Sequence, residues 1–304
     1  MSETIAIRTE GLTKSYGQVR ALRGVNLEVR QGEMFGFLGP NGAGKTTTIR
    51  CLLDLIRPDS GSVRVLGLDP QANPVAVRSR VGYLPGELNL EPNLRVDQAL
   101  RYLNDLRGNQ AEWSHVRELA QGLDLDLSTA IKNLSKGNKQ KLGVVQALMH
   151  RPELLLLDEP TAGLDPLMQQ QVYRLLREAR SSGATVFFSS HIIREVETLA
   201  DRVAIIRQGV IVEEAQPGQL VGMSMRRVRL RFKEPVDPGR LTAVEGVTLV
   251  SQSNGVNLIL QVEGEIDGLI KALAGMPVAD METEHASLEE AFLAYYADAR
   301  EEAN

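Results

Sequence analysis

A glycine-rich stretch that ends in lysine and threonine is the part of this sequence best suited to chemistry. It reads Gly39-Pro40-Asn41-Gly42-Ala43-Gly44-Lys45-Thr46-Thr47, the G-x-x-x-x-G-K-T spacing of a phosphate-binding P-loop. Glycines let the backbone curl so that several N–H groups point inward, and a following helix N-terminus adds positive potential. Lys45 can then reach the β- and γ-phosphates of a nucleotide, and Thr46 can offer its hydroxyl to Mg²⁺.

A second motif supplies the acidic residues that a nucleotide-hydrolysing site needs. Four leucines, Leu154–Leu157, precede Asp158 and Glu159. Asp158 could hold Mg²⁺ through water, and Glu159, one residue further out, could act as a general base on the attacking water. Two adjacent carboxylates after an apolar strand are not typical of a solvated charge pair.

Hydrophobic patterns around these motifs predict an α/β fold, in which strands alternate with helices packed against a sheet. Short apolar runs favour central strands, and alternation near the N-terminus favours an antiparallel hairpin region. A mainly helical insert interrupts the rhythm at about 86–133. The expected strands are 5–7, 25–29, 34–38, 154–157, 185–188 and 203–206, and the expected helices are 46–55, 96–107, 112–121, 138–149, 167–181 and 192–199.

The pattern changes near residue 222, which predicts a domain of residues 1–222 followed by a small α+β domain of residues 223–304. Asn254-Gly255 between two apolar alternations is a strong hairpin signal. The predicted order β-α-β-β-α-β fits a ferredoxin-like unit. Its elements are expected at 226–232, 238–243, 247–251, 256–262, 266–273 and 277–283, with a last helix at 287–299 that places Leu288, Ala291, Phe292 and Tyr295 on one face.

Composition narrows the function classes. The 304 residues are 43% hydrophobic and 24% charged, which is ordinary for a folded protein. Residues 223–304 hold 8 basic against 14 acidic residues, so nucleic-acid binding is not expected there. The single cysteine, Cys51, excludes an internal disulfide and a cysteine-based zinc cluster. No apolar run predicts a membrane span or a signal peptide, so a role at a membrane would require docking onto another protein.

Taken together, residues of about 4–220 resemble the nucleotide-binding domain of an ABC (ATP-binding cassette) ATPase. The motifs occur in the order of that family. The P-loop matches its Walker A motif and the acidic strand end matches Walker B. The remaining matches are Tyr16 in Lys14-Ser-Tyr-Gly17, the signature Leu134-Ser-Lys-Gly-Asn138, the D-loop Ala162-Gly-Leu-Asp165 and the switch histidine His191.

The resemblance implies a RecA-like core with an antiparallel β subdomain and a helical subdomain, and a head-to-tail dimer that sandwiches two ATP molecules with Mg²⁺. It implies that Glu159 and His191 are catalytic, and that Thr46 and Asp158 hold the metal ion. Ser135 and Gly137 would meet the γ-phosphate bound by the other copy. The implied nucleotide contacts are Tyr16, Gly39, Pro40, Asn41, Gly42, Ala43, Gly44, Lys45, Thr46, Thr47, Ser135, Gly137 and Asp165.

Two departures from the family pattern stand out. The signature carries Lys136 and Asn138 where the family usually has glycine and glutamine. Gly86 stands where the family usually has a glutamine that reaches Mg²⁺ and senses the transporter subunit. Our hypothesis is that Glu87 partly replaces that glutamine, or that another water does.

One ATPase domain and a C-terminal domain of about 80 residues resemble the ATP-binding subunit of bacterial ABC-2-type exporters, as does the ending Ala286–Leu293. The resemblance implies an ATPase on the cytoplasmic face of the membrane, working with a separate polytopic permease that docks on the insert 86–133. An importer ATPase remains an alternative. A non-transport ABC ATPase acting on ribosomes or DNA is another, although no long coiled-coil insertion or zinc module is predicted.

Overall fold

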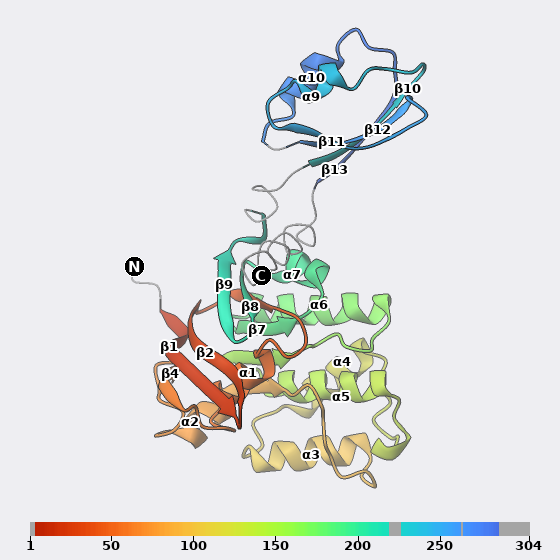
Figure 1. Ribbon diagram of the computed structural model, residues 1–304. Helices are drawn as coiled ribbons and strands as arrows, with labels where there is room; N and C mark the ends of the chain where they lie inside the picture. Colours follow the sequence, from red (N-terminus) through yellow and green to blue (C-terminus); the bar gives the residue numbers. More distant parts are fainter. Residues whose placement is uncertain (1–3, 219–225, 263, 286–304) are drawn as a thin grey trace. The chain divides into compact units, whose positions relative to one another are not determined.

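The apolar runs predicted as central strands lie side by side in one six-stranded sheet (Figure 1). Its order is β5-β6-β7-β3-β8-β9, in which the first five strands are parallel and β9 is antiparallel. Every residue of β3, β6 and β7 is buried, as expected for strands covered on both faces. The bounds are β3 Met34–Leu38, β5 Val81–Leu84, β6 Leu154–Asp158, β7 Thr185–Ser190, β8 Arg202–Arg207 and β9 Val210–Ala215.

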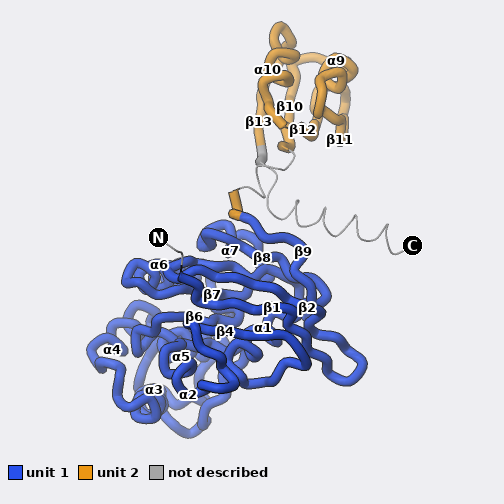
Figure 2. The backbone as a smooth tube through the Cα atoms, turned by 90° about the vertical axis from the view of Figure 1, so that its left-hand side faces the viewer, with its two compact units in different colours: residues 1–215 blue, residues 216–304 orange. Residues whose placement is uncertain are grey.

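This computed structural model describes residues 4–218, 226–262 and 264–285. The chain divides into two compact units, residues 1–215 and residues 216–304 (Figure 2). Among the described helices, none has the length and apolar character that crossing a bilayer requires.

One face of the large sheet packs against a three-stranded antiparallel sheet of order β2-β1-β4. The strands are β1 Ile5–Tyr16, β2 Val19–Arg30 and β4 Ser60–Val65. Two of them are much longer than the predicted strands 5–7 and 25–29. Register shifts in the β1–β2 ladder explain the difference, because each bulge interrupts the apolar alternation by which a strand is recognised. Ile7 of this sheet and Phe35 and Phe37 of the large sheet share one buried core.

Helices α5 and α7 lie on the other face, where strand glycines allow their close approach, whereas α1 and α2 contribute to the core shared with the antiparallel sheet. A Cβ at Gly36 of β3 would lie 2.9 Å from Val196 of α7, and one at Gly82 of β5 would lie 2.1 Å from the Ala147 carbonyl of α5. The helices are α1 Lys45–Leu52, α2 Pro74–Ser79, α3 Val96–Leu106, α4 Trp113–Gly122, the 3₁₀ turn η1 Ile131–Asn133, α5 Lys136–Leu148, α6 Pro166–Ser181 and α7 Ile193–Leu199.

Helix ends differ from the predictions where backbone conformation decides them. The helix expected to reach Leu55 ends at Leu52, and Asp54 adopts a positive φ of 51° that a helix cannot continue through. The helix expected from residue 138 begins at Lys136, because the Ser135 side chain caps it by accepting a hydrogen bond from the Asn138 N–H.

The described residues of the second unit form an antiparallel sheet of order β11-β12-β10-β13 and two short helices. Asn254 and Gly255 have φ values of 52° and 68°, which confirms the predicted turn between β11 and β12. The predicted helix at 287–299 and the Ala286–Leu293 ending lie outside the described residues. The bounds are β10 Arg226–Phe232, α9 Gly239–Thr242, β11 Val247–Ser253, β12 Asn257–Val262, α10 Asp267–Leu273 and β13 Val278–His285.

Candidate functional site

The candidate site lies at the carboxyl ends of β6, β7 and β3, which are neighbours in the sheet. The P-loop follows β3, Asp158 and Glu159 stand at the end of β6, and His191 follows β7. Because parallel strands end at the same edge, residues more than 100 positions apart in sequence meet there. Ligand sites of open α/β sheets form at this edge for the same reason.

The P-loop is packed too tightly for side chains at its first glycine. A Cβ at Gly39 would lie 2.4 Å from the Ile206 carbonyl oxygen, and Gly44 has a φ of 112°. Lys45 is buried within the loop, where its Nζ donates to the carbonyls of Gly39 at 2.6 Å and Pro40 at 3.2 Å. Burial lowers the pKa of Lys45, and the charges of Glu159 and Asp158 oppose that shift.

Asp158 has both carboxylate oxygens engaged. The Thr46 hydroxyl donates to Oδ2 at 2.7 Å, and the Ser189 hydroxyl donates to Oδ1 at 2.6 Å. The side chain is only 2% exposed, so these charge-assisted bonds fix it in one place. The two residues expected to hold a metal ion are therefore brought into direct contact.

The Glu159 carboxylate lies close to two other side chains of the site, those of His191 and Lys45. Its Oε1 lies 3.0 Å from His191 Nδ1 and 3.6 Å from Lys45 Nζ. The backbone of Glu159 has a positive φ of 52°, and its N–H donates to the Ser189 carbonyl and hydroxyl oxygens. Gln140 of α5 donates to the Glu159 carbonyl at 2.9 Å. These bonds hold a conformation that is uncommon for a residue with a side chain.

The signature and D-loop residues contact each other. A Cβ at Gly137 would lie 3.0 Å from the Gly163 carbonyl oxygen, and the exposed Lys136 side chain passes along Gly163. The Ser135 side chain caps α5, and exposed Asp165 caps α6 by accepting from two backbone N–H groups at 3.0 Å. Their side-chain hydrogen bonds therefore go to their own helices and not to the P-loop.

Known proteins resemble the chain over most of its length. The daunorubicin/doxorubicin resistance ATP-binding protein DrrA of Streptomyces peucetius is 35% identical over 307 residues, covering 96% of this chain and 92% of that protein. The bacitracin transport ATP-binding protein BcrA of Bacillus licheniformis is 40% identical, covering 68% of this chain and 69% of that protein. The family model for the ABC transporter matches residues 22–162. The chain belongs to the ABC transporter family.

A solved structure of the ATP-binding subunit of an ABC transporter agrees with this assignment. It superimposes with a TM-score of 0.66 at 28% identity, over 71% of this chain and 91% of that one. The P-loop ABC ATPase fold and the α/β class predicted from the sequence are confirmed for this part of the chain. As a member of this ATPase family, the chain binds and hydrolyses ATP.

The structure places Tyr16 at an exposed strand end and Gly86 beside Asp158. Tyr16 ends β1 and is 47% exposed, with Lys14 Nζ 5.9 Å from its ring centre, so its face is accessible for stacking. A Cβ at Gly86 would lie 3.1 Å from Asp158 Oδ2, so position 86 directly faces the candidate metal ligand. The neighbouring Glu87 is exposed.

Three residues of the site were not singled out from the sequence: Gln140, Ser189 and Glu195, whose carboxylate accepts from the Thr161 and Ser190 hydroxyls. Ser189 could have been found from its position, because Ser189-Ser190 ends the predicted strand directly before His191. Gln140 and Glu195 are polar residues on helices. Nothing in their local sequence separates them from surface positions.

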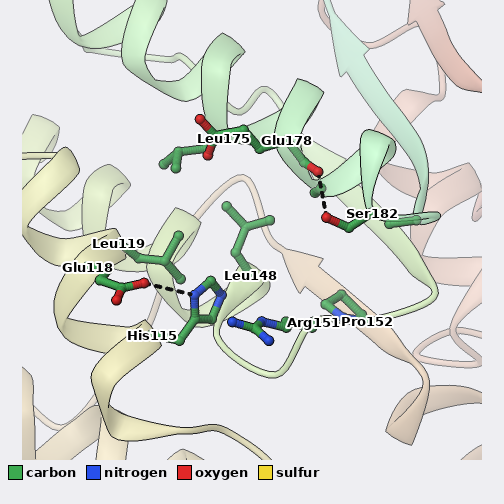
Figure 3. Close-up of a pocket in the computed structure, with 11 residues that line it drawn as sticks. His115, Glu118, Leu119, Leu148, Arg151, Pro152, Leu175, Glu178 and Ser182 are labelled. Carbon is green, nitrogen blue, oxygen red and sulfur yellow. Dashed lines mark hydrogen bonds and ion pairs between the residues drawn. The ribbon is translucent and has the colours of Figure 1, made fainter.

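A separate pocket of 610 Å³ lies between α4, α6 and the turn that follows α5 (Figure 3). Leu119, Leu148 and Leu175 form part of its wall, and His115 and Arg151 are at its polar side. The pocket lies near the amino ends of β6 and β7. None of its lining residues belongs to the nucleotide motifs.

Proposed function

We propose that this chain is the ATP-hydrolysing subunit of an exporter, with Glu159 as general base and His191 as the residue that orients the attacking water. The observation that carries the residue roles is the cluster of Glu159 Oε1, His191 Nδ1 and Lys45 Nζ at the end of the P-loop sheet. Relatives named for drug resistance, bacitracin transport and Nod factor export support export over import.

The contact between His191 and Glu159 limits which partners each can take. A neutral imidazole ring has one N–H, so a ring that donates to Glu159 has none left for a γ-phosphate. We therefore propose that His191 parts from Glu159 when ATP binds, which leaves the Glu159 carboxylate to accept a proton from water.

The P-loop residues, from Gly39 to Thr47, would cradle the phosphates with backbone N–H groups and the Lys45 ammonium. Tyr16 would stack on the adenine. The ATP-binding domain would correspond to residues 1–222 and include the helical insert 86–133. The match of the family model to residues 22–162 supports this assignment.

A Mg²⁺ ion fits the residues at Thr46 and Asp158. A hydroxyl and a carboxylate in contact at 2.7 Å are oxygen ligands of the kind Mg²⁺ prefers, and the glycine at 86 adds no side chain beside Asp158. The bound ion would neutralise charge on the β- and γ-phosphates. The described residues contain no group of three or more His, Cys, Asp or Glu side chains suited to a metal, so the phosphates would complete the site.

Dimerisation is proposed from the placement of Ser135, Gly137 and Asp165. The N-terminus of α5, with the Ser135 hydroxyl, carries donors suited to a phosphate, and Asp165 is exposed on the D-loop, yet the side-chain hydrogen bonds of both residues stay within their own helices. A second copy could present its ATP to them. ATP would then hold two copies together, and hydrolysis would release them.

The partner proposed for this dimer is a polytopic permease, which would place the subunit peripherally on the cytoplasmic face of the membrane. On α3 of the insert, Tyr102 and Leu106 are one turn apart and 58% and 67% exposed, which suits a short amphipathic helix of the partner. No nucleic-acid partner is proposed.

We propose that residues 223–304 form a ferredoxin-like accessory domain that stabilises the dimer or tunes coupling. The element order β10-α9-β11-β12-α10-β13 and the antiparallel sheet order β11-β12-β10-β13 support that fold.

The test is the Glu159→Gln variant in native membranes. It should bind ATP while hydrolysing it at least about a hundredfold more slowly, which traps the closed complex. Crosslinking followed by mass spectrometry should then join residues 86–133 to a polytopic membrane protein. Recovery of ribosomal or DNA-associated proteins instead would contradict the transport proposal and leave the ATPase assignment intact.

A further inference from the structure

Glu195 of α7 is a buried carboxylate with a specific pair of partners. It is 2% exposed, and each of its oxygens accepts a hydrogen bond from one hydroxyl. The Thr161 hydroxyl donates to Oε1 at 2.8 Å, and the Ser190 hydroxyl donates to Oε2 at 2.5 Å. Burying a charge costs free energy unless the charge is paired or hydrogen-bonded. Losing either hydroxyl from Glu195 would therefore be unfavourable, and the two bonds restrain the segments that carry the hydroxyls.

The two hydroxyls belong to the two loops that carry the proposed catalytic pair. Thr161 lies two residues after Glu159, and Ser190 directly precedes His191. The Ser190 hydroxyl also accepts from the Ile192 N–H at 2.9 Å, which ties both sides of the histidine to one oxygen. Glu195 therefore joins the chain after the general base to the chain around the switch histidine.

We propose that Glu195 is a positioning residue that fixes the separation of Glu159 and His191 by bridging Thr161 and Ser190. This inference rests on the catalytic roles proposed above for that pair. The pair itself is partly exposed, at 27% for the Glu159 side chain and 44% for His191, so its own hydrogen bond competes with water. The bridge from Thr161 through Glu195 to Ser190 is buried, so its hydrogen bonds do not compete with water.

The helix that carries Glu195 is itself held in place. Val196, the next residue, is fully buried, and a Cβ at Gly36 of β3 would lie 2.9 Å from its side chain. Burial raises the pKa of Glu195, while the hydrogen bonds from Ser190 and Thr161 oppose that shift. The Glu195 carboxylate and the two hydroxyls that it binds are thus fixed relative to β3, the strand that leads into the P-loop.

The experiment measures ATP hydrolysis by the full-length chain for three variants at Glu195. In Glu195→Ala both bonds are lost, and we expect kcat to fall about ten- to hundredfold with KM for ATP changed less than about twofold. Glu195→Asp, one methylene shorter, cannot span both hydroxyls and should behave similarly. Glu195→Gln keeps the length, accepts from Thr161 and can donate to Ser190, so it should stay within about threefold of wild type.

The control is Glu197→Ala, an exposed carboxylate on the same helix that should leave kcat unchanged. A Glu195→Ala enzyme with wild-type kcat would overturn the proposal, as would a parallel loss of kcat and ATP affinity. A glutamine variant as inactive as the alanine one would also overturn it, because it would show a need for charge instead of a bridge. If Glu195→Ala does not fold, Thr161→Val removes one bond, and an unchanged kcat there contradicts the bridge.

A double variant separates this inference from the roles on which it rests. If Glu159→Gln alone leaves hydrolysis intact, the assignment of the general base fails, whatever Glu195 does. If Glu159→Gln retains a slow, measurable hydrolysis, adding Glu195→Ala should lower that residual rate little further, since both changes act on one step. Fully multiplicative losses would show that Glu195 acts independently of the pair.

Discussion

At the residue scale, the site separates what is rigid from what has to respond to nucleotide. Asp158 and Thr46 are locked by hydrogen bonds of 2.7 Å or less, and both lie at buried or half-buried positions. Glu159 and His191 are more exposed and bind each other. This difference suits the proposed roles, since a metal ligand benefits from a fixed position, whereas a base and a switch residue have to exchange partners when substrate arrives.

The first prediction concerns Glu87 beside the glycine that replaces the family's glutamine. If Glu87 contributes a ligand through water, Glu87→Ala should raise the Mg²⁺ concentration needed for half-maximal hydrolysis by about three- to tenfold. The measurement is the ATPase rate across a Mg²⁺ titration, with the exposed Glu91→Ala as control. An unchanged rate and an unchanged Mg²⁺ dependence would show that Glu87 does not replace the glutamine.

At the scale of elements, close helix–strand contacts determine how accurately the loops are placed. The helix α5 carries the signature at its N-terminus and Gln140 one turn later, and it packs directly on β5 through Gly82. A change in this packing would move Gln140 relative to the Glu159 carbonyl that it binds. The strand glycine is thus linked to the site through one helix.

The second prediction tests that contact. Gly82→Ala places a methyl group 2.1 Å from the Ala147 carbonyl and 2.8 Å from Leu155 and Pro152, so the helix has to shift. We expect the free energy of unfolding to fall by about 1–3 kcal/mol. Gly122→Ala, whose added methyl meets only the Arg174 guanidinium at 3.6 Å, is the control and should be neutral. Chemical denaturation of both variants measures the difference.

The third prediction concerns pH and His150, which lies just past the end of α5. Its Nε2 is 3.2 Å from Arg107 Nη1, and burial, with the arginine charge, lowers its pKa to about 4. Because the folded pKa lies below the unfolded value of about 6.5, the unfolded chain takes up the proton first. The free energy of unfolding is therefore unaffected by the titration of His150 above about pH 6.5. It falls by up to about 3 kcal/mol as the pH falls towards 4.

Denaturation of the wild type and of His150→Gln between pH 7 and pH 4 measures this effect. The variant should lose less stability over that range than the wild type, whatever its stability at pH 7. Parallel pH profiles for the two proteins would contradict the assigned shift.

At the scale of the whole molecule, the chain has separate hydrophobic cores in its two units. The larger one joins both sheets of residues 1–215. In the other unit, Val228, Leu230, Leu258, Leu260 and Leu269 belong to a core of their own. Each unit therefore has a hydrophobic core of its own, as expected of a domain.

The fourth prediction follows from these separate cores. Leu260 is fully buried in the second unit, so Leu260→Ala should destabilise that unit by about 2–5 kcal/mol. Calorimetry should show one transition shifted and the other unchanged, and ATP affinity should be retained. A single transition that moves as a whole would show instead that the two units unfold together.

The sequence by itself determined the ATPase family and the strands that end at the candidate site, and it predicted the residues that would contact phosphate. Those features are local: the P-loop glycines, Lys45 and the leucines before Asp158 are read within a few positions of one another. The Asn254-Gly255 turn was local in the same way. The β1 and β2 lengths were missed because their bulges are set by pairing between strands.

Only the tertiary structure decided which polar residues support the site. Gln140 and Glu195 lie on helices, and nothing nearby in sequence shows that one binds the Glu159 carbonyl and the other joins Thr161 to Ser190. Gln140 is 19 residues from Glu159 in the sequence, and Glu195 is 34 residues from Thr161. Hydrogen bonds between residues so far apart in the sequence form only once the sheet has brought its strand ends together and buried the groups between them.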